Sequence, residues 1–294
     1  MAGETSKPRL GPDPGEETAA GRTHYPTSPI FFDHIPKTAG TSVAQLLTRA
    51  YPRDEVMHID HADKINGADR HIFGHHRCYH GHFGTLLTGI LDPAIPTVTL
   101  LRDPYDQTIS LVKHVLRTTI DTKPAWTRPI LARTAHRILP LFVFLAVYPQ
   151  RHWVQNFQTR WLGVDLDIDS FACTEGGLNK QLQLPESSLP EALEKAKRRL
   201  DSMAVVGTVD NIDEFVRNVF NLIGVPAPEA IPHRNVGYGI RPGHSHRQST
   251  WLPQFLVRRI DAIPRYDREL YAYACELARR PVPASRTTED IHGN

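Results

Sequence analysis

Residues 30–42 read Ile-Phe-Phe-Asp-His-Ile-Pro-Lys-Thr-Ala-Gly-Thr-Ser, and this stretch decides the fold. The apolar run that ends at Pro36 is typical of a buried strand. Residues 41–50 then place Val43, Leu46 and Leu47 at helical spacing. A strand, a turn that contains a glycine and a helix make up the first half of a βαβ unit. The stretch therefore predicts the start of an α/β fold.

Strands and helices alternate along the rest of the chain. Residues 97–101 form the clearest central strand, and a helical pattern follows from Tyr105 to Arg117. Further strands are predicted at residues 55–59, 70–73 and 203–206. Further helices are predicted over residues 121–162, 189–200, 210–222, 251–263 and 265–279, with a capping box at Ser188 and a cap at Asp210. This alternation predicts a mostly parallel central sheet that is flanked by helices on both faces.

The composition fits an ordinary globular protein. Lys and Arg number 34 against 32 Asp and Glu, which leaves a net charge of +2, and 40% of the residues are hydrophobic. Such a balance excludes a disordered chain and argues against a dedicated nucleic-acid binder. The three cysteines, Cys78, Cys173 and Cys275, are too few and too scattered for a disulfide framework or a CxxC zinc site. They are typical of a reducing compartment.

The two ends of the chain differ from its middle. Residues 1–28 are polar and rich in proline and glycine, which predicts a disordered leader without the apolar segment of a secretory signal. Residues 280–294 predict a disordered tail, so residues 29–279 remain as a single domain. The longest apolar run, residues 138–148, is shorter than the roughly 20 residues that a membrane-spanning helix needs. No transmembrane segment is expected.

The turn between the first strand and its helix has the features of an anion site. Free N–H groups and the positive end of the helix dipole meet there. Gly40 is expected to let the backbone turn tightly, Thr41 and Ser42 add hydroxyl donors, and Lys37 adds a full positive charge. The nucleotide-triphosphate P-loop places its lysine after the last glycine, whereas Lys37 precedes Gly40. The turn therefore predicts a phosphate cradle of a different kind.

The segment His-Ile-Pro-Lys-Thr-Ala-Gly-Thr-Ser, residues 34–42, resembles the 5′-phosphosulfate loop of sulfotransferases that use 3′-phosphoadenosine-5′-phosphosulfate (PAPS). It is most similar to the carbohydrate group that includes heparan sulfate 2-O-sulfotransferase. The resemblance implies a P-loop-like three-layer α/β fold and PAPS as co-substrate, with no metal required. It also implies that Lys37 acts in catalysis and that the following residues bind the donor with it: Lys37, Thr38, Ala39, Gly40, Thr41 and Ser42.

A second segment, residues 99–110, resembles the 3′-phosphate segment of the same family. It has an arginine at the end of a strand and a serine eight residues later, which implies that Arg102 and Ser110 bind the 3′-phosphate. Weaker resemblances lie at residues 156–160 (an N-x-Q-x-R pattern), at 206–215, at Asn235 and at 267–271. Together they cover about residues 30–274.

Seven of the 16 histidines lie within 25 residues: His58, His61, His71, His75, His76, His80 and His82. Sulfuryl transfer to a hydroxyl needs a group that accepts the proton, and a histidine does so at neutral pH. The segment from Tyr79 to Phe83 resembles the one that carries the catalytic base in uronyl 2-O-sulfotransferases. This predicts His82 as the base, with His80 assisting and His75 as the rival candidate. A zinc site is the weaker alternative, because no cysteine pair supports it.

The resemblance also bears on the acceptor. It implies a hydroxyl of a carbohydrate or glycoconjugate, and the excess of Lys and Arg from residue 113 to 137 would suit an anionic sugar. Residues 118–162 are a candidate acceptor region. Two other functions stay open: a P-loop kinase with Asp103 as the metal-binding carboxylate, and a nucleotide-binding protein without catalysis. A bacterial cytoplasmic protein is expected.

Overall fold

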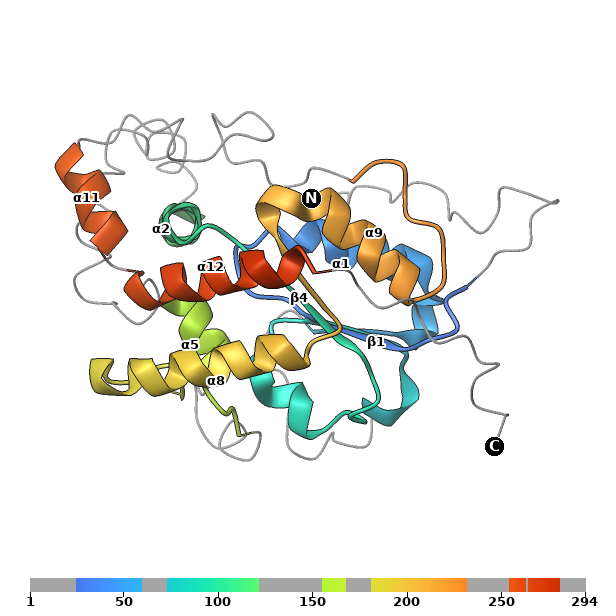
Figure 1. Ribbon diagram of the computed structural model, residues 1–294. Helices are drawn as coiled ribbons and strands as arrows, with labels where there is room; N and C mark the ends of the chain where they lie inside the picture. The colour runs from blue at the N-terminus through green and yellow to red at the C-terminus, as the bar shows by residue number, and fades with distance from the viewer. Residues whose placement is uncertain are drawn as a thin grey trace, which may run out of the picture.

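The computed structural model describes residues 25–59, 73–121, 155–167, 181–231, 254–262 and 264–280. Five parallel strands form one sheet in the order β2-β3-β1-β4-β5 (Figure 1). The strands are β1 (Ile30–Asp33), β2 (Val56–Ile59), β3 (Cys78–Gly81), β4 (Thr97–Leu101) and β5 (Val205–Thr208). The predicted α/β fold with a parallel central sheet is confirmed.

Helices cover both faces of the sheet (Figure 1). On one face lie α1 (Gly40–Ala50) and α9 (Ile212–Leu222), and on the other lie α5 (Phe157–Gly163), α8 (Leu189–Ser202) and α12 (Arg265–Ala278). Successive side chains of a strand point to opposite faces, so Phe32 joins the core under α1 while Phe31 joins the core under α5 and α8. The strands are apolar on both faces for this reason, and the three-layer arrangement is confirmed.

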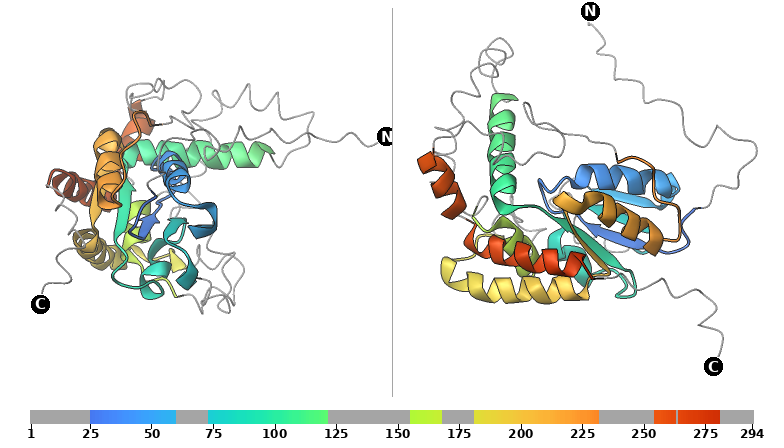
Figure 2. Two further views of the ribbon diagram at one scale, coloured as in Figure 1. Left: turned by 90° about the vertical axis from the view of Figure 1, so that its right-hand side faces the viewer. Right: turned by 45° about the horizontal axis from the view of Figure 1, so that its top comes forward.

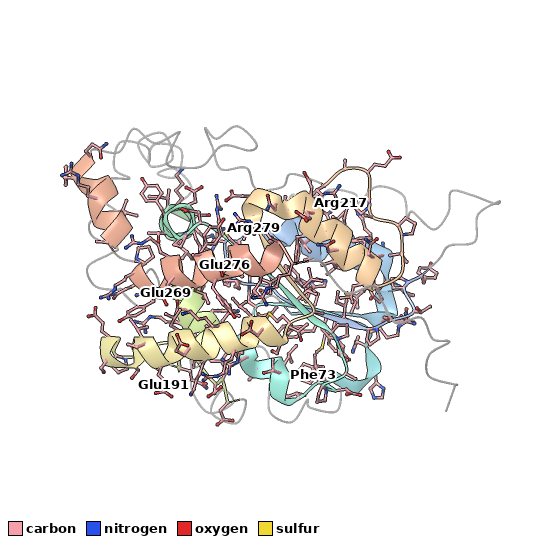
Figure 3. The ribbon with its side chains drawn as sticks, in the orientation of Figure 1. Phe73, Glu191, Arg217, Glu269, Glu276 and Arg279 are labelled. Atoms are coloured by element: carbon pink, nitrogen blue, oxygen red, sulfur yellow. The ribbon has the colours of Figure 1, made fainter. Side chains whose placement is uncertain are left out.

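Two further helices lie beyond the sheet. Figure 2 shows α2 (Pro104–Asp121) leaving the end of β4 and running away from the sheet, with α11 (Gln254–Ala262) beside it. On the outer layer, Lys197 of α8 donates to Glu269 of α12 at 2.7 Å, and Figure 3 labels Glu269. Exposed ion pairs of this kind are worth little. The buried leucines of α8 and α12, among them Leu193 and Leu270, hold this layer to the sheet.

Strand β3 was not among the predicted strands. Its four residues include a histidine and a glycine, and they form a strand because β1 pairs with them on one side and β2 on the other. The strand predicted at residues 70–73 is wrong at Phe73, which begins a 3-10 turn, and its other residues lie outside the described ones. The last strand starts two residues later than predicted, because α8 continues to Ser202.

Both predicted helix caps are wrong. Ser188 precedes α8, but it ends the 3-10 turn Glu186–Ser188 with helical backbone angles, and its side chain makes no capping hydrogen bond. A capping serine needs an extended backbone to reach the helix N–H groups. Asp210 lies in the 3-10 turn Val209–Asn211, and α9 begins after Asn211, again without a side-chain cap.

Several predictions concern residues outside the described ones. They include the leader up to residue 24, the apolar run 138–148, most of the candidate acceptor region, His61, His71, Asn235 and the tail from residue 281. Residues 25–28 of the predicted leader are described, and they contact the domain. The Tyr51 hydroxyl, for example, donates to the carbonyl of Ser28 at 2.6 Å.

Candidate functional site

The ends of the strands gather the candidate residues at one edge of the sheet. Because the strands are parallel, the residues that follow β1, β3 and β4 lie at the same carboxyl edge. These residues are the loop 34–39, His82 and Arg102. From β1 the chain goes to β2 and β3 on one side and then crosses to β4 on the other. The strand order therefore reverses at β1, and open α/β sheets bind their ligands beside such a reversal.

The loop between β1 and α1 has the backbone of an anion cradle. Lys37 and Ala39 have left-handed φ angles of 68° and 62°, which residues other than glycine rarely adopt. Ala39 leads directly into α1, and a left-handed residue beside a right-handed one turns successive N–H groups into one concavity. The first turn of α1 has no side-chain cap and no acidic residue. This geometry suits the phosphate that the sequence predicts here.

Position 40 requires glycine because a side chain would not fit there, and not because the turn needs a left-handed residue at that position. A Cβ at this position would lie 2.1 Å from Cδ2 of the His34 ring. That ring is buried and stacks on Phe32 with 5.4 Å between the ring centroids. The prediction that Gly40 makes the tight turn is therefore wrong, since Lys37 and Ala39 adopt the left-handed angles. Burial, and next the nearby His82, hold the pKa of His34 well below its usual range, so the ring is neutral at neutral pH.

The hydroxyls of the loop have different surroundings. Thr38 is fully buried, and its hydroxyl donates to the carbonyl of Ile35 at 2.8 Å. Its proton thus holds the loop together and is not aimed at a ligand. Ser42 is buried in the first turn of α1, whereas Thr41 is exposed there. Of the three hydroxyls, only that of Thr41 is openly accessible.

Arg102 joins the two predicted phosphate segments. One guanidinium nitrogen donates to the carbonyl of Lys37 at 3.2 Å. The backbone of Arg102 is held by the side chain of Gln158, which accepts from its N–H at 3.0 Å and donates to its carbonyl at 2.9 Å. Burial lowers the pKa of Arg102, while Asp106 and Asp103 oppose this shift. An arginine stays charged in such surroundings, so a positive charge lies beside the loop.

Helix α2 carries two more polar residues of interest. Ser110, the predicted phosphate contact, is half-buried in its second turn. Lys113 follows three residues later, and such residues share a helix face. Burial lowers the pKa of Lys113, with the charge of Arg102 as the second cause, so the two cations lie near each other. Lys113 is not among the predicted site residues; its spacing from Ser110 is the signal that could have found it.

His82 lies directly after β3 at the carboxyl edge. Its Nδ1 is 2.8 Å from the carbonyl oxygen of His34. A carbonyl only accepts, so Nδ1 carries the proton and the lone pair of the neutral ring is on Nε2. The ring lies 4.4 Å from the ring of His34 and stands edge-on to Trp161 at 6.2 Å, at an interplanar angle of 89°. The contact with His34 therefore fixes which nitrogen of the ring carries the proton.

The rival candidate His75 lies elsewhere. It is exposed in the turn that precedes β3. The start of a parallel strand lies at the edge opposite to the loop 34–39. The structure therefore brings His82, and not His75, to the loop 34–39.

His80 also points away from His82. The Thr48 hydroxyl donates to the carbonyl of Ala44 at 2.8 Å, so it accepts from Nε2–H of His80, also at 2.8 Å. Nδ1 of neutral His80 is then an acceptor, and it lies 3.0 Å from Nδ1 of His58, which donates. Both nitrogens of His80 are engaged on the side of α1 and β2. Its assisting role remains a prediction that these contacts do not favour.

Two of the weaker resemblances, at residues 156–160 and 267–271, form one network behind Arg102. Helix α5 carries Gln158, and its start is capped by the buried Asp267, whose oxygens accept the N–H groups of Gln158 and Thr159 at 3.2 and 2.7 Å. The side chain of Asn156 in turn accepts the N–H of Tyr266 at 2.7 Å. The N-x-Q-x-R pattern therefore holds α5, α12 and the end of β4 in fixed positions.

Asp33, the last residue of β1, is a buried carboxylate that the sequence did not single out. Burial raises its pKa from 3.8 to about 6, and a hydrogen bond from Trp161 opposes the shift. The folded protein therefore binds this proton more tightly than the unfolded chain, and stability falls as the pH rises from 4 past 6. A pKa difference of about two units corresponds to about 3 kcal/mol in the free energy of unfolding.

Replacing Asp33 by asparagine tests whether the buried negative charge lowers the free energy of unfolding. Asp33→Asn keeps an oxygen for Trp161 and removes the charge. We expect the variant to exceed the wild type by up to about 3 kcal/mol in the free energy of unfolding at pH 8, and by almost nothing at pH 4. Urea unfolding at both pH values measures the difference. A difference that does not change with pH would contradict the buried charge as its cause.

Among the described residues, no group of three or more His, Cys, Asp and Glu side chains has the arrangement of a metal site. In the same part of the chain, no helix combines the length and the apolar character needed to cross a membrane.

A scan against models of protein families and a search of curated proteins returned no match for this chain.

Proposed function

We propose that this protein is a PAPS-dependent sulfotransferase that moves a sulfuryl group to a hydroxyl of a carbohydrate or glycoconjugate. The observation that carries the proposal is the contact between Arg102 and the carbonyl of Lys37, at 3.2 Å. It joins two segments, 65 residues apart, to which the resemblance to sulfotransferases separately assigns the two phosphate groups of one nucleotide. His82 is held by the same loop through the carbonyl of His34.

The donor would be held by charge and by backbone N–H groups. The guanidinium of Arg102 suits the 3′-phosphate, with the hydroxyl of Ser110 as a second donor. The N–H groups at the start of α1 suit the 5′-phosphosulfate, which also takes the charge of Lys37. Thr38 supports this loop from within, through its bond to Ile35.

His82 would receive the proton. The acceptor oxygen forms a bond to sulfur while the bond from sulfur to the 5′-phosphate oxygen breaks. The hydroxyl proton passes to Nε2 of His82, and 3′-phosphoadenosine-5′-phosphate leaves. Lys37 stabilises the negative charge that develops on the bridging oxygen. The hydrogen bond from Nδ1 of His82 to His34 keeps Nε2 as the accepting nitrogen throughout.

Asp103 bears on the kinase alternative. Its carboxylate accepts the N–H of Asp106 at 3.1 Å, so it caps the first turn of α2. A cap is an ordinary use of an aspartate at this position. No contact of the described residues favours the kinase over the sulfotransferase.

Calorimetry with 3′-phosphoadenosine-5′-phosphate, in the absence of metal, tests the donor site. We expect binding in about the micromolar range, much weaker binding of 5′-AMP, and loss of binding in Arg102→Ala, because the 3′-phosphate then lacks its fork. Arg217→Ala, which removes an arginine on the outer face of α9 (Figure 3), is the matched control and should bind as the wild type does. Binding of ATP with magnesium and none of the 3′-phosphorylated nucleotide would overturn the proposal.

A further inference from the structure

Trp161 of α5 forms the wall against which the ring of His82 rests. Its side chain is completely buried. The indole stands edge-on to His82, with 6.2 Å between the ring centroids, and packs on Phe157 at 5.7 Å. Edge-to-face contacts of this kind favour a particular angle between the rings. The angle of the indole therefore affects the angle of the imidazole.

The indole is itself fixed by Asp33. Its Nε1–H donates to Oδ1 of Asp33 at 2.9 Å, and both groups are buried. If the indole rotated, its buried N–H would lose its acceptor and the buried carboxylate of Asp33 would lose its donor. Both losses cost free energy. The backbone of Asp33 is held as well, because its carbonyl accepts the hydroxyl of Thr99 in β4 at 2.8 Å.

Asp33, the last residue of β1, and His34, which follows it, thus hold His82 from two sides. The carbonyl of His34 accepts the hydrogen bond from Nδ1–H, and Asp33 fixes the indole that the ring touches. Strand β1 is the central strand and is paired on both sides, so this support is rigid. Helix α5 is also held firmly against α8, where a Cβ on Gly163 would lie 2.2 Å from the carbonyl oxygen of Ala192.

We propose that Trp161, locked by its hydrogen bond to Asp33, is a positioning residue that sets the orientation of the His82 ring for proton acceptance. The inference rests on the proposed role of His82 as base. The indole touches neither the loop 34–39 nor Arg102 in any contact of the described residues, so we expect its replacement to change nucleotide affinity little. The same helix, through Gln158, holds the backbone of Arg102.

The test compares two replacements of Asp33 that have similar size. Asp33→Leu removes the acceptor of the indole N–H, whereas Asp33→Asn keeps one. Trp161→Phe removes the donor and retains an aromatic ring. Leu193→Val, in the same core on α8, is the control for a general loss of packing. Nitrogen-15 NMR of the His82 ring at pH 8 reports which nitrogen carries the proton, and it needs no acceptor.

In the wild type and in Leu193→Val we expect one tautomer of His82, protonated on Nδ1. In Trp161→Phe and Asp33→Leu we expect a mixture of tautomers and turnover that is lower by about tenfold to a hundredfold, with Asp33→Asn close to the wild type. The affinity for 3′-phosphoadenosine-5′-phosphate should stay within about twofold in all of them. A single Nδ1–H tautomer and unchanged turnover in Trp161→Phe would overturn the positioning role.

The two proposals fail in different ways. If the nucleotide does not bind the wild type, the proposed function fails, while the NMR comparison still reports whether Trp161 orients His82. If the nucleotide binds and the tautomer of His82 is insensitive to Trp161 and Asp33, the positioning role alone is rejected.

Discussion

His82→Ala is expected to abolish sulfuryl transfer and to leave the binding of 3′-phosphoadenosine-5′-phosphate intact. The variant removes the nitrogen that accepts the hydroxyl proton, and a positioned base contributes about a hundredfold to ten-thousandfold to such a step. The proposed nucleotide contacts come from other residues, the loop 37–42 and Arg102, whereas the hydrogen bond of His82 goes to the carbonyl of His34, outside them. Turnover with labelled PAPS and calorimetry with the spent nucleotide measure the two quantities separately.

His75→Ala is the matched control for this variant. His75 lies exposed before β3, at the opposite edge of the sheet, so its loss should change neither turnover nor affinity. Loss of transfer in His75→Ala with normal transfer in His82→Ala would reverse the assignment of the base. Loss of nucleotide binding in His82→Ala would show instead that the ring supports the phosphate loop.

Lys37→Ala is expected to reduce turnover far more than nucleotide affinity. Its side chain would stabilise charge that develops on the bridging oxygen, and one such donor is worth about 3 kcal/mol, or about a hundredfold in rate. The contact with Arg102 is made by the carbonyl of Lys37, so the substitution leaves it in place. Lysine and alanine must both adopt the left-handed backbone at position 37. Backbone strain is therefore the same in the wild type and in Lys37→Ala.

Lys37→Arg and Lys197→Ala provide the controls. Lys37→Arg keeps the charge and should retain part of the turnover, although its planar fork differs from an ammonium group. Lys197 pairs with Glu269 on the outer layer, and its loss should not alter turnover. Turnover of Lys37→Ala equal to that of the wild type would remove Lys37 from the catalytic step.

The parts of the fold that the sequence predicts correctly are those with local signals. Strand β1 and α1 follow from an apolar run and a helical period, and β4 with α2 follows in the same way. Strand β3 was missed because its order comes from two neighbouring strands that are distant in the sequence. The cap at Ser188 was wrong because a 3-10 turn, which the residue pattern does not indicate, sets its backbone angles.

The same distinction applies to the candidate site: some of its features follow from local sequence, and others depend on contacts between distant residues. Residues on the loop and at the strand ends, such as Lys37 and Arg102, could be named from a short pattern. The protonated nitrogen of His82 could not, because it is set by a carbonyl 48 residues away. The roles of Asp33 and Trp161 likewise depend on a contact across 128 residues. A sequence pattern identifies the groups, whereas three-dimensional packing decides which atom of a ring carries the proton and which contacts each group makes.

The contact between His34 and Gly40 has an evolutionary consequence. The ring fills the space that a side chain at position 40 would need. An aromatic residue at position 34 therefore demands glycine at position 40, whereas a smaller residue at 34 would permit alanine or serine there. Homologous sequences should accordingly show the two positions changing together, and a double replacement should be tolerated where the single change at position 40 is not.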